Sequence, residues 1–175
     1  MRALRRTRGL TLAELAGRLG RSVGWLSQVE RDLSPLGPGD AAPIAAALDV
    51  PVSLLADRAG AGGTERGRIV RRDARRPIGS RHPGLNEELL SPDLTDDFEV
   101  VHSVFAPGAA LEQPMTRPTQ ELGFMIGGKL DLWIGGQSYT VAAGDSFRIR
   151  GETYRWANPY EETAVALWVI APPVY

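Results

Sequence analysis

The sequence LTLAELAGRLGRSVGWLSQVER, residues 10–31, decides the fold of the N-terminal part of the chain. Its first half places apolar residues at the spacing of one helical face: Leu12, Leu15, Ala16 and Leu19. Thr11 and Glu14 have the spacing of a capping box, in which each side chain accepts from the other residue's backbone amide. Gly20 tolerates the left-handed conformation that ends many helices. We therefore predict a helix between Thr11 and Gly20.

The second half of the stretch predicts another helix. Ser22 is a favourable N-cap residue, and Leu26 and Val29 would face the protein interior. Two helices joined by a tight turn that contains glycine form the helix-turn-helix arrangement.

The helical pattern continues after this pair and then stops. Residues 41–48 predict a further helix, with Asp40 as its cap and Pro43 tolerated in the first turn. A short helical turn is expected at residues 53–55. The small residues at 59–63 are typical of a flexible linker.

Beyond about residue 68 the pattern becomes that of strands. Residues 98–105 are rich in β-branched and aromatic residues. Residues 129–134 alternate between polar or aromatic positions and the apolar residues Leu130, Leu132 and Ile134. Paired glycines at 127–128 and 135–136 suit tight hairpin turns. We expect an all-α domain at residues 1–57, a linker at 58–67 and an all-β barrel or sandwich at 68–175.

Composition excludes several classes of protein. The 175 residues contain no cysteine, so disulfides, thiolate metal sites and cysteine nucleophiles are excluded. The only two histidines, His82 and His102, cannot form a site of three imidazoles within one chain. No apolar run approaches the ~18 residues of a membrane span. No apolar stretch of a signal peptide follows the basic start, so we expect a cytoplasmic protein.

The net charge of −1 conceals an asymmetry. Residues 1–31 hold seven arginines and two glutamates, a net charge of +5. The remaining residues hold 13 basic and 19 acidic groups, a net charge of −6. A basic N-terminal block indicates a different partner for that part of the chain, and nucleic acid is one candidate.

Residues 10–31 resemble the lambda-repressor-like, or Xre-type, family of DNA-binding domains, and the segment at 49–55 resembles the end of that domain. The resemblance implies that the helix after Ser22 enters the major groove of double-stranded operator DNA. Gln28 suits adenine, Ser27 donates or accepts, and Val23 suits a thymine methyl. The candidate DNA-binding residues are Arg21, Ser22, Val23, Gly24, Trp25, Ser27, Gln28 and Arg31.

Residues 108–128 and 144–158 resemble the two motifs of the cupin family, which implies a jelly-roll barrel. Glu121 keeps its place in the first motif, but its two histidine positions fall on Met115 and Arg117, or on Pro114 and Thr116 in the alternative spacing. The third histidine position falls on Tyr154 or Arg155. Because neither spacing supplies an imidazole, we expect no metal ligands and no cofactor.

A barrel without a metal can still bind a small molecule. Arg117, or Arg155, could bind an anionic group, and aromatic residues would supply buried area. The candidate ligand-binding residues are Met115, Arg117, Gln120, Glu121, Phe124, Tyr154, Trp156 and Trp168.

Three functions are consistent with these patterns. The first is a transcriptional regulator without enzymatic activity, a homodimer that binds operator DNA and senses a small molecule in its barrel. The second is a metal-dependent cupin enzyme, such as an oxygenase, epoxidase or isomerase, with an attached helix-turn-helix-like domain. In the third, the barrel serves only to form the dimer.

Overall fold

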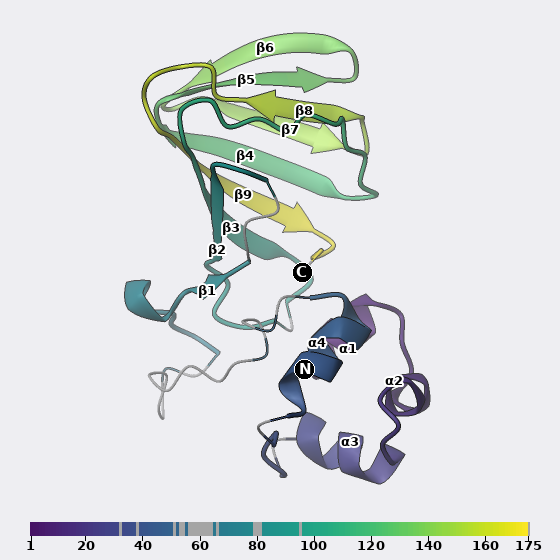
Figure 1. Ribbon diagram of the computed structural model, residues 1–175. Coiled ribbons are helices and arrows are strands. Elements are labelled where there is room, and N and C mark those ends of the chain that lie inside the picture. Colours follow the sequence, from purple (N-terminus) through teal and green to yellow (C-terminus); the bar gives the residue numbers. More distant parts are fainter. Residues whose placement is uncertain are drawn as a thin grey trace.

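The computed structural model of the chain describes residues 1–31, 33–37, 39–50, 52, 55, 65, 67–78, 82–94 and 96–174. Helices gather at the N-terminal end and strands make up the rest (Figure 1). The helical turn expected at 53–55 and the linker expected at 58–67 lie mostly outside the described residues. No helix among the described residues is long and apolar enough to cross a membrane.

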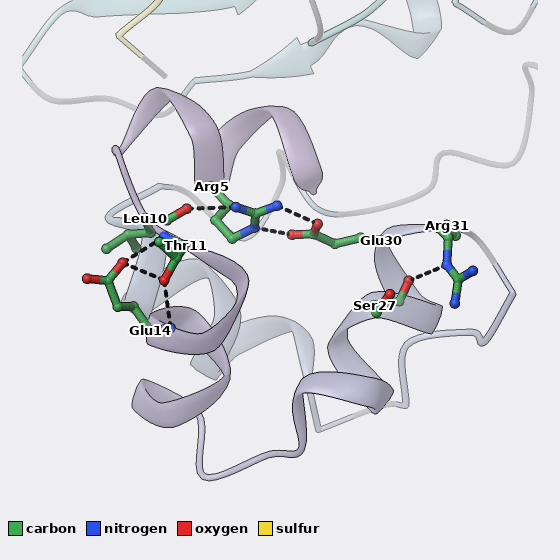
Figure 2. A network of polar contacts seen from close by, with 7 residues as sticks. All are labelled: Arg5, Leu10, Thr11, Glu14, Ser27, Glu30 and Arg31. Carbon is green, nitrogen blue, oxygen red and sulfur yellow. Dashed lines mark hydrogen bonds and ion pairs between the residues drawn. The ribbon is translucent and has the colours of Figure 1, made fainter.

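Four short helices form the N-terminal part: α1 (Arg2–Thr7), α2 (Leu12–Arg18), α3 (Val23–Glu30) and α4 (Ala41–Leu48). The predicted capping box is confirmed, since the Thr11 side chain accepts from the Glu14 amide and the Glu14 carboxylate accepts from the Thr11 amide (Figure 2). Gly20 ends α2 with a positive φ of 61°. Ser22 caps α3 by accepting from the Trp25 amide at 3.1 Å.

Asp40 precedes α4 as predicted, but the prediction that its side chain caps the helix is wrong. The side chain makes no cap hydrogen bond, and the backbone of Asp40 is already helical. Its Oδ2 instead accepts from the Gly37 amide, and its Oδ1 accepts from Arg21 of the α2–α3 turn. Asp40 therefore ties the turn to the start of α4, because a guanidinium partner competes for the carboxylate that would otherwise cap the helix.

The C-terminal part is a jelly roll of two antiparallel sheets that do not close into a continuous barrel. The larger sheet has the order β1-β2-β3-β9-β4-β7, and the smaller has the order β6-β5-β8 (Figure 1). The strands of the larger sheet are β1 (Arg76–Pro77), β2 (Leu85–Leu89), β3 (Glu99–Phe105), β9 (Ala164–Ala171), β4 (Gln120–Gly127) and β7 (Ser146–Arg150). The smaller sheet consists of β5 (Lys129–Ile134), β6 (Gln137–Ala142) and β8 (Tyr154–Ala157).

Two glycine turns position the smaller sheet. Gly135 and Gly136 join β5 to β6 in a two-residue hairpin in which both residues have positive φ, as predicted. Gly128 also has positive φ, and a Cβ atom built there would lie 2.5 Å from the Thr163 carbonyl oxygen. Only glycine fits this close approach between the start of β5 and the loop before β9.

The alternation of β4 decides which of its residues reach the space between the sheets. Glu121, Gly123 and Met125 are buried, whereas Gln120, Leu122 and Phe124 are exposed. Gln120 and Phe124 were also expected to line a ligand site, but their side chains lie on the opposite face of β4 from Glu121. Because side chains alternate along a strand, a site that includes Glu121 excludes residues one and three positions away.

Candidate functional site

The outer face of α3 is the first candidate site. Leu26 and Val29 are buried against the other helices, as predicted. Val23 is 46% exposed. Gly24 and Gln28 are exposed as well, and Ser27 is half-buried. The residues predicted to read base edges therefore lie on or beside the face of α3 that is turned away from the core.

The predicted phosphate-binding residues surround this face. The Arg21 guanidinium stacks over the half-buried Trp25 ring at 5.0 Å and bonds to Asp40 at 2.6 Å. Arg31 donates from Nε to the Ser27 carbonyl at 3.1 Å (Figure 2). Ser22 uses its hydroxyl to cap α3. Arg21 and Arg31 are thus oriented at the two ends of the exposed helix face.

Several other arginines of the basic block serve the fold. Arg5 bonds to the Glu30 carboxylate and to the Leu10 carbonyl (Figure 2). Arg8 donates to the Leu48 and Asp49 carbonyls at 2.7 and 2.8 Å, which satisfies the exposed end of α4. In the sequence, Arg5 and Arg8 could be recognised only as positive charges. No local pattern relates residue 5 to residue 30 or residue 8 to residue 48.

The second candidate site is a small cavity between the two sheets, with a volume of about 40 Å³. Six predicted ligand-binding residues line it: Met115, Arg117, Glu121, Tyr154, Trp156 and Trp168. The predictions missed His82 and Glu87, which also line it. Glu87 was detectable, because it alternates with the buried Leu85 and Leu89 and so faces inward with them. His82 lies in the preceding loop, where no periodicity applies.

Of the two possible spacings of the first cupin motif, the structure supports the one that includes Met115 and Arg117. Met115 pairs with Tyr154 in an isolated bridge, and both line the cavity with Arg117 and Glu121. Thr116 is exposed and bonds to Thr153, away from the cavity. Arg155 stacks on Trp133 at 3.8 Å and does not line the cavity. Arg117, not Arg155, is therefore the cation that faces the cavity.

The polar groups of the cavity are held in place by neighbours. Thr119 donates to Glu121 Oε1 at 2.7 Å, and Ser103 donates to Glu87 Oε1 at 2.8 Å. Burial raises the pKa of Tyr154 well above its ordinary value of 10.0, with Glu121 and Glu87 adding to the rise and Arg117 opposing it. The cavity therefore holds a neutral phenol beside two carboxylates and one guanidinium.

The Trp168 indole N–H is an unusual group in this wall. Trp168 is 5% exposed, and its Nε1 has no hydrogen-bond partner among the described residues. A buried donor without a partner costs about 1–3 kcal/mol. A bound acceptor would recover that free energy.

The cavity does not fit the metal centre that many cupins carry. Of the four motif positions Met115, Arg117, Glu121 and Tyr154, only Glu121 carries a carboxyl group that could bind a metal ion. Met115 offers a thioether, Tyr154 stays protonated and Arg117 brings a positive charge that repels a divalent cation. Among the described residues, no group of three or more histidine, aspartate or glutamate side chains is arranged to hold a metal ion.

Comparison with known families finds two domains. Residues 1–59 match the helix-turn-helix domain family, and residues 101–170 match the cupin domain family. No curated protein matches the chain.

Solved structures resemble the chain in fold. A cupin from Shewanella frigidimarina described as RmlC-like is 15% identical, with 61% of this chain and 91% of that chain covered and a TM-score of 0.53. KdgF from a Halomonas species is 17% identical, with 62% and 96% covered and a TM-score of 0.53. A helix-turn-helix family transcriptional regulator from Vibrio cholerae is 21% identical, with 99% and 93% covered and a TM-score of 0.48. The family matches therefore identify an N-terminal helix-turn-helix domain and a C-terminal cupin domain in this chain.

Proposed function

We propose that the protein is a sequence-specific transcriptional regulator. The observation that carries this proposal is the division of α3, in which Leu26 and Val29 are buried while Val23, Gly24 and Gln28 are exposed. A helix presented in this way fits the major groove, where residues near its N-terminus reach base edges.

Each residue of this face has a role that its chemistry supports. Gln28 bonds bidentately to adenine, Ser27 donates or accepts, and Val23 contacts a thymine methyl. Gly24 leaves room for the backbone to approach the DNA. Phosphates are bound by the amides after Ser22 and by the residues Arg21, Trp25 and Arg31.

A homodimer would present two such helices to half-sites about one helical turn apart, which predicts a pseudo-palindromic operator. The same role is consistent with the cytoplasmic location that we expect from the sequence.

The test is selection of an operator from random duplexes, followed by fluorescence anisotropy at several salt concentrations. Gln28→Ala removes a bidentate base contact and should weaken operator binding by about 1–3 kcal/mol, roughly 5- to 150-fold, with less effect on random DNA. Gln113→Ala is the matched control, since Gln113 is an exposed glutamine in the cupin domain. Equal binding to all sequences, or equal loss with both variants, would contradict the proposal.

The cavity between the sheets is the proposed effector site. Arg117 and the Trp168 N–H are its donors, and they favour a small molecule with an anionic or acceptor group. The volume of about 40 Å³ holds no more than a water or two, so a larger effector must displace the wall of the cavity. If the dimer has two arrangements that differ in their affinity for DNA, an effector that binds one of them more tightly shifts the affinity for DNA.

A thermal-shift screen with small carboxylates and phosphates tests this role, because a bound ligand raises the melting temperature by mass action. Arg117→Met should abolish the shift, and Arg155→Met, which changes an arginine outside the cavity, should keep it. Shifts that survive Arg117→Met would contradict the assignment. If no compound shifts the wild type, the barrel is a dimerisation domain only.

The alternative of a metal-dependent enzyme has less support. Met115, Arg117 and Tyr154 occupy the positions of imidazole ligands, and their chemistry opposes a divalent cation. Metal analysis of untagged protein distinguishes the two functions, since stoichiometric iron, zinc or manganese would favour the enzyme.

A further inference from the structure

The chain contains three methionines, and one of them lines the cavity between the two sheets. Met115 is half-buried, so part of it is open to solvent, whereas Met125 is 0% exposed in the core. Met1 is half-buried as well, but it precedes α1 and lies outside the cavity. A mild oxidant attacks the sulfur of methionine where no cysteine is present, and this chain has none. Met115 is therefore the group in this cavity that such an oxidant attacks first.

The backbone holds the Met115 side chain beside Tyr154. The Met115 amide donates to the Tyr154 carbonyl at 2.8 Å, and the Tyr154 amide donates to the Met115 carbonyl at 2.8 Å. The Tyr154 hydroxyl donates to Met115 Sδ, with the oxygen and the sulfur 3.5 Å apart. The adjacent residues Thr116 and Thr153 share a hydrogen bond of 2.8 Å between their hydroxyls. These contacts keep the sulfur next to a hydroxyl donor.

Two further donors of the cavity have no acceptor among the described residues. Trp168 is 5% exposed, and its Nε1 has no hydrogen-bond partner in that part of the chain. No hydrogen bond or ion pair joins the half-buried guanidinium of Arg117 to another described residue. The two carboxylates of the cavity accept from neighbouring hydroxyls instead. A thioether is a weak acceptor, so the reduced side chain of Met115 does not meet this need.

The size of the cavity favours a very small oxidant. Its volume of about 40 Å³ holds no more than a water or two. Hydrogen peroxide has only one heavy atom more than water, and it donates and accepts hydrogen bonds as water does. It therefore fits the space beside the Met115 sulfur without displacing the wall of the cavity.

We propose that Met115 is an oxidation site, at which hydrogen peroxide converts the thioether to a sulfoxide whose oxygen is bound by the donors of the cavity. A lone pair of the sulfur forms a bond to one peroxide oxygen while the O–O bond breaks. The other oxygen leaves as hydroxide and takes the proton of the transferred oxygen to become water. The sulfur is oxidised by two electrons and the peroxide is reduced by two. The positive charge of Arg117 stabilises the departing hydroxide.

The donors of the cavity suit the product of this reaction. A sulfoxide is polar, and its oxygen destabilises a core that offers it no donor. At Met115 the Tyr154 hydroxyl already points at the sulfur, and the Trp168 N–H gains an acceptor in the same cavity. Because reductases restore the thioether, the change is reversible. The inference rests on the effector role proposed for the cavity and names an oxidant as the effector, but its test needs no DNA.

The first test is peptide mapping by mass spectrometry after timed exposure of the full chain to dilute hydrogen peroxide. Met115 should gain one oxygen atom at least about fivefold faster than Met1, and Met125 should stay unmodified. Arg117→Leu should remove this advantage, and Arg155→Leu, which changes an arginine outside the cavity, should keep it. Equal rates at Met115 and Met1, or an equal loss with both arginine variants, would overturn the proposal.

The configuration at sulfur is a second readout of the same reaction. Oxidation of an unconstrained methionine gives both sulfoxide epimers, whereas a sulfur fixed beside Tyr154 presents mainly one lone pair to the cavity. The two classes of methionine sulfoxide reductase each reduce one epimer, so treatment with each enzyme measures the ratio. One dominant epimer is expected at Met115. An even mixture would show a thioether that is accessible but not held, contrary to the proposal.

The third test measures whether the cavity binds the sulfoxide oxygen. Trp168→Phe removes the indole N–H, so oxidation should lower its melting temperature by about 2–4 °C more than that of the wild type. Trp133→Phe, at a tryptophan outside the cavity, should respond to peroxide as the wild type does. Met115→Leu should show no change with peroxide. Equal responses of Trp168→Phe and the wild type would overturn the proposed binding of the oxygen.

These outcomes are separate from DNA binding. A chain that is oxidised selectively at Met115 but binds no operator would overturn the proposed function and leave the oxidation site intact. A chain that binds its operator but shows no selectivity for Met115 would overturn the oxidation site alone.

Discussion

Arg5 of α1 and Glu30 at the end of α3 form a two-point ion pair, with Nε–Oε1 at 2.7 Å and Nη2–Oε2 at 2.9 Å (Figure 2). Their side chains are 10% and 4% exposed. The hydrogen bond to Glu30 raises the pKa of Arg5 above its ordinary value of 12.5, so the guanidinium stays charged. Arg5 also donates to the Leu10 carbonyl and so holds α1, the turn before α2 and the end of α3 in one arrangement.

The first prediction concerns this pair. Glu30→Ala leaves a buried guanidinium without its carboxylate and should lower the free energy of unfolding by about 3–5 kcal/mol, measured by urea denaturation. Arg21→Ala breaks a more exposed ion pair, that of Arg21 and Asp40, and should cost at most about 1 kcal/mol. Equal effects of the two variants would contradict the structural role of Glu30.

The second prediction concerns the capping box and pH. Hydrogen bonds from the Thr11 amide and hydroxyl lower the pKa of Glu14 below 4.5. Because the pKa of Glu14 is lowered in the folded state, its carboxylate contributes to the free energy of unfolding above pH 4.5. This contribution is lost as the pH falls through the folded-state pKa of Glu14. Glu14→Gln keeps the capping geometry, so the melting temperature should depend less steeply on pH below 4.5.

Thr11→Ala removes the cap itself and should cost about 1 kcal/mol at neutral pH. Ala13→Ser, at an exposed position of the same helix, is the control for small changes in helix propensity. A wild type and Glu14→Gln variant with the same acid profile would contradict this account of the capping box.

The third prediction compares two glycines with positive φ. Gly136→Ala has open space for the new methyl group and should cost only the strain of a left-handed alanine, about 1–2 kcal/mol. Gly128→Ala meets that strain and also the Thr163 carbonyl at 2.5 Å, which should add roughly 1–3 kcal/mol. Chemical denaturation of the two variants measures the difference, and equal losses would show that the backbone at Thr163 moves freely.

The fourth prediction concerns the cavity at high pH. Burial raises the pKa of Tyr154, so the unfolded state ionises at about 10.0 while the folded state stays neutral. The contribution of Tyr154 to the free energy of unfolding is therefore fully present below pH 10. It is lost as the pH rises toward the folded-state pKa of Tyr154. Tyr154→Phe should weaken this loss in alkaline denaturation, and a variant that loses stability at high pH as steeply as the wild type would contradict the prediction.

Local patterns in the sequence predicted the helices well. The bounds of α2 and α3 follow from Thr11, Gly20 and Ser22, because caps act on the backbone of neighbouring residues. The pair of Arg5 and Glu30 could not be predicted, because it depends on how α1 packs against α3. Asp40 was misassigned for the same reason, since Arg21 reaches it only in the folded domain.

The cavity was predicted in part. The motif positions Met115, Arg117, Glu121 and Tyr154 come together because the two motifs lie on adjoining strands and loops of the jelly roll. Phe124, an aromatic residue expected at the same site, lies on the other face of β4, because side chains alternate along the strand and Phe124 is three positions from Glu121.

The arginine side chains that form hydrogen bonds within the helical domain affect how strongly DNA binding depends on salt. Arg5 directs its hydrogen bonds to Glu30 and Leu10, and Arg8 directs its own to the carbonyls at the end of α4. Fewer cations then remain to displace the potassium ions that coat a chromosome. For the proposed regulator, operator affinity should therefore fall less steeply with rising salt than contacts from all seven arginines of residues 1–31 would give.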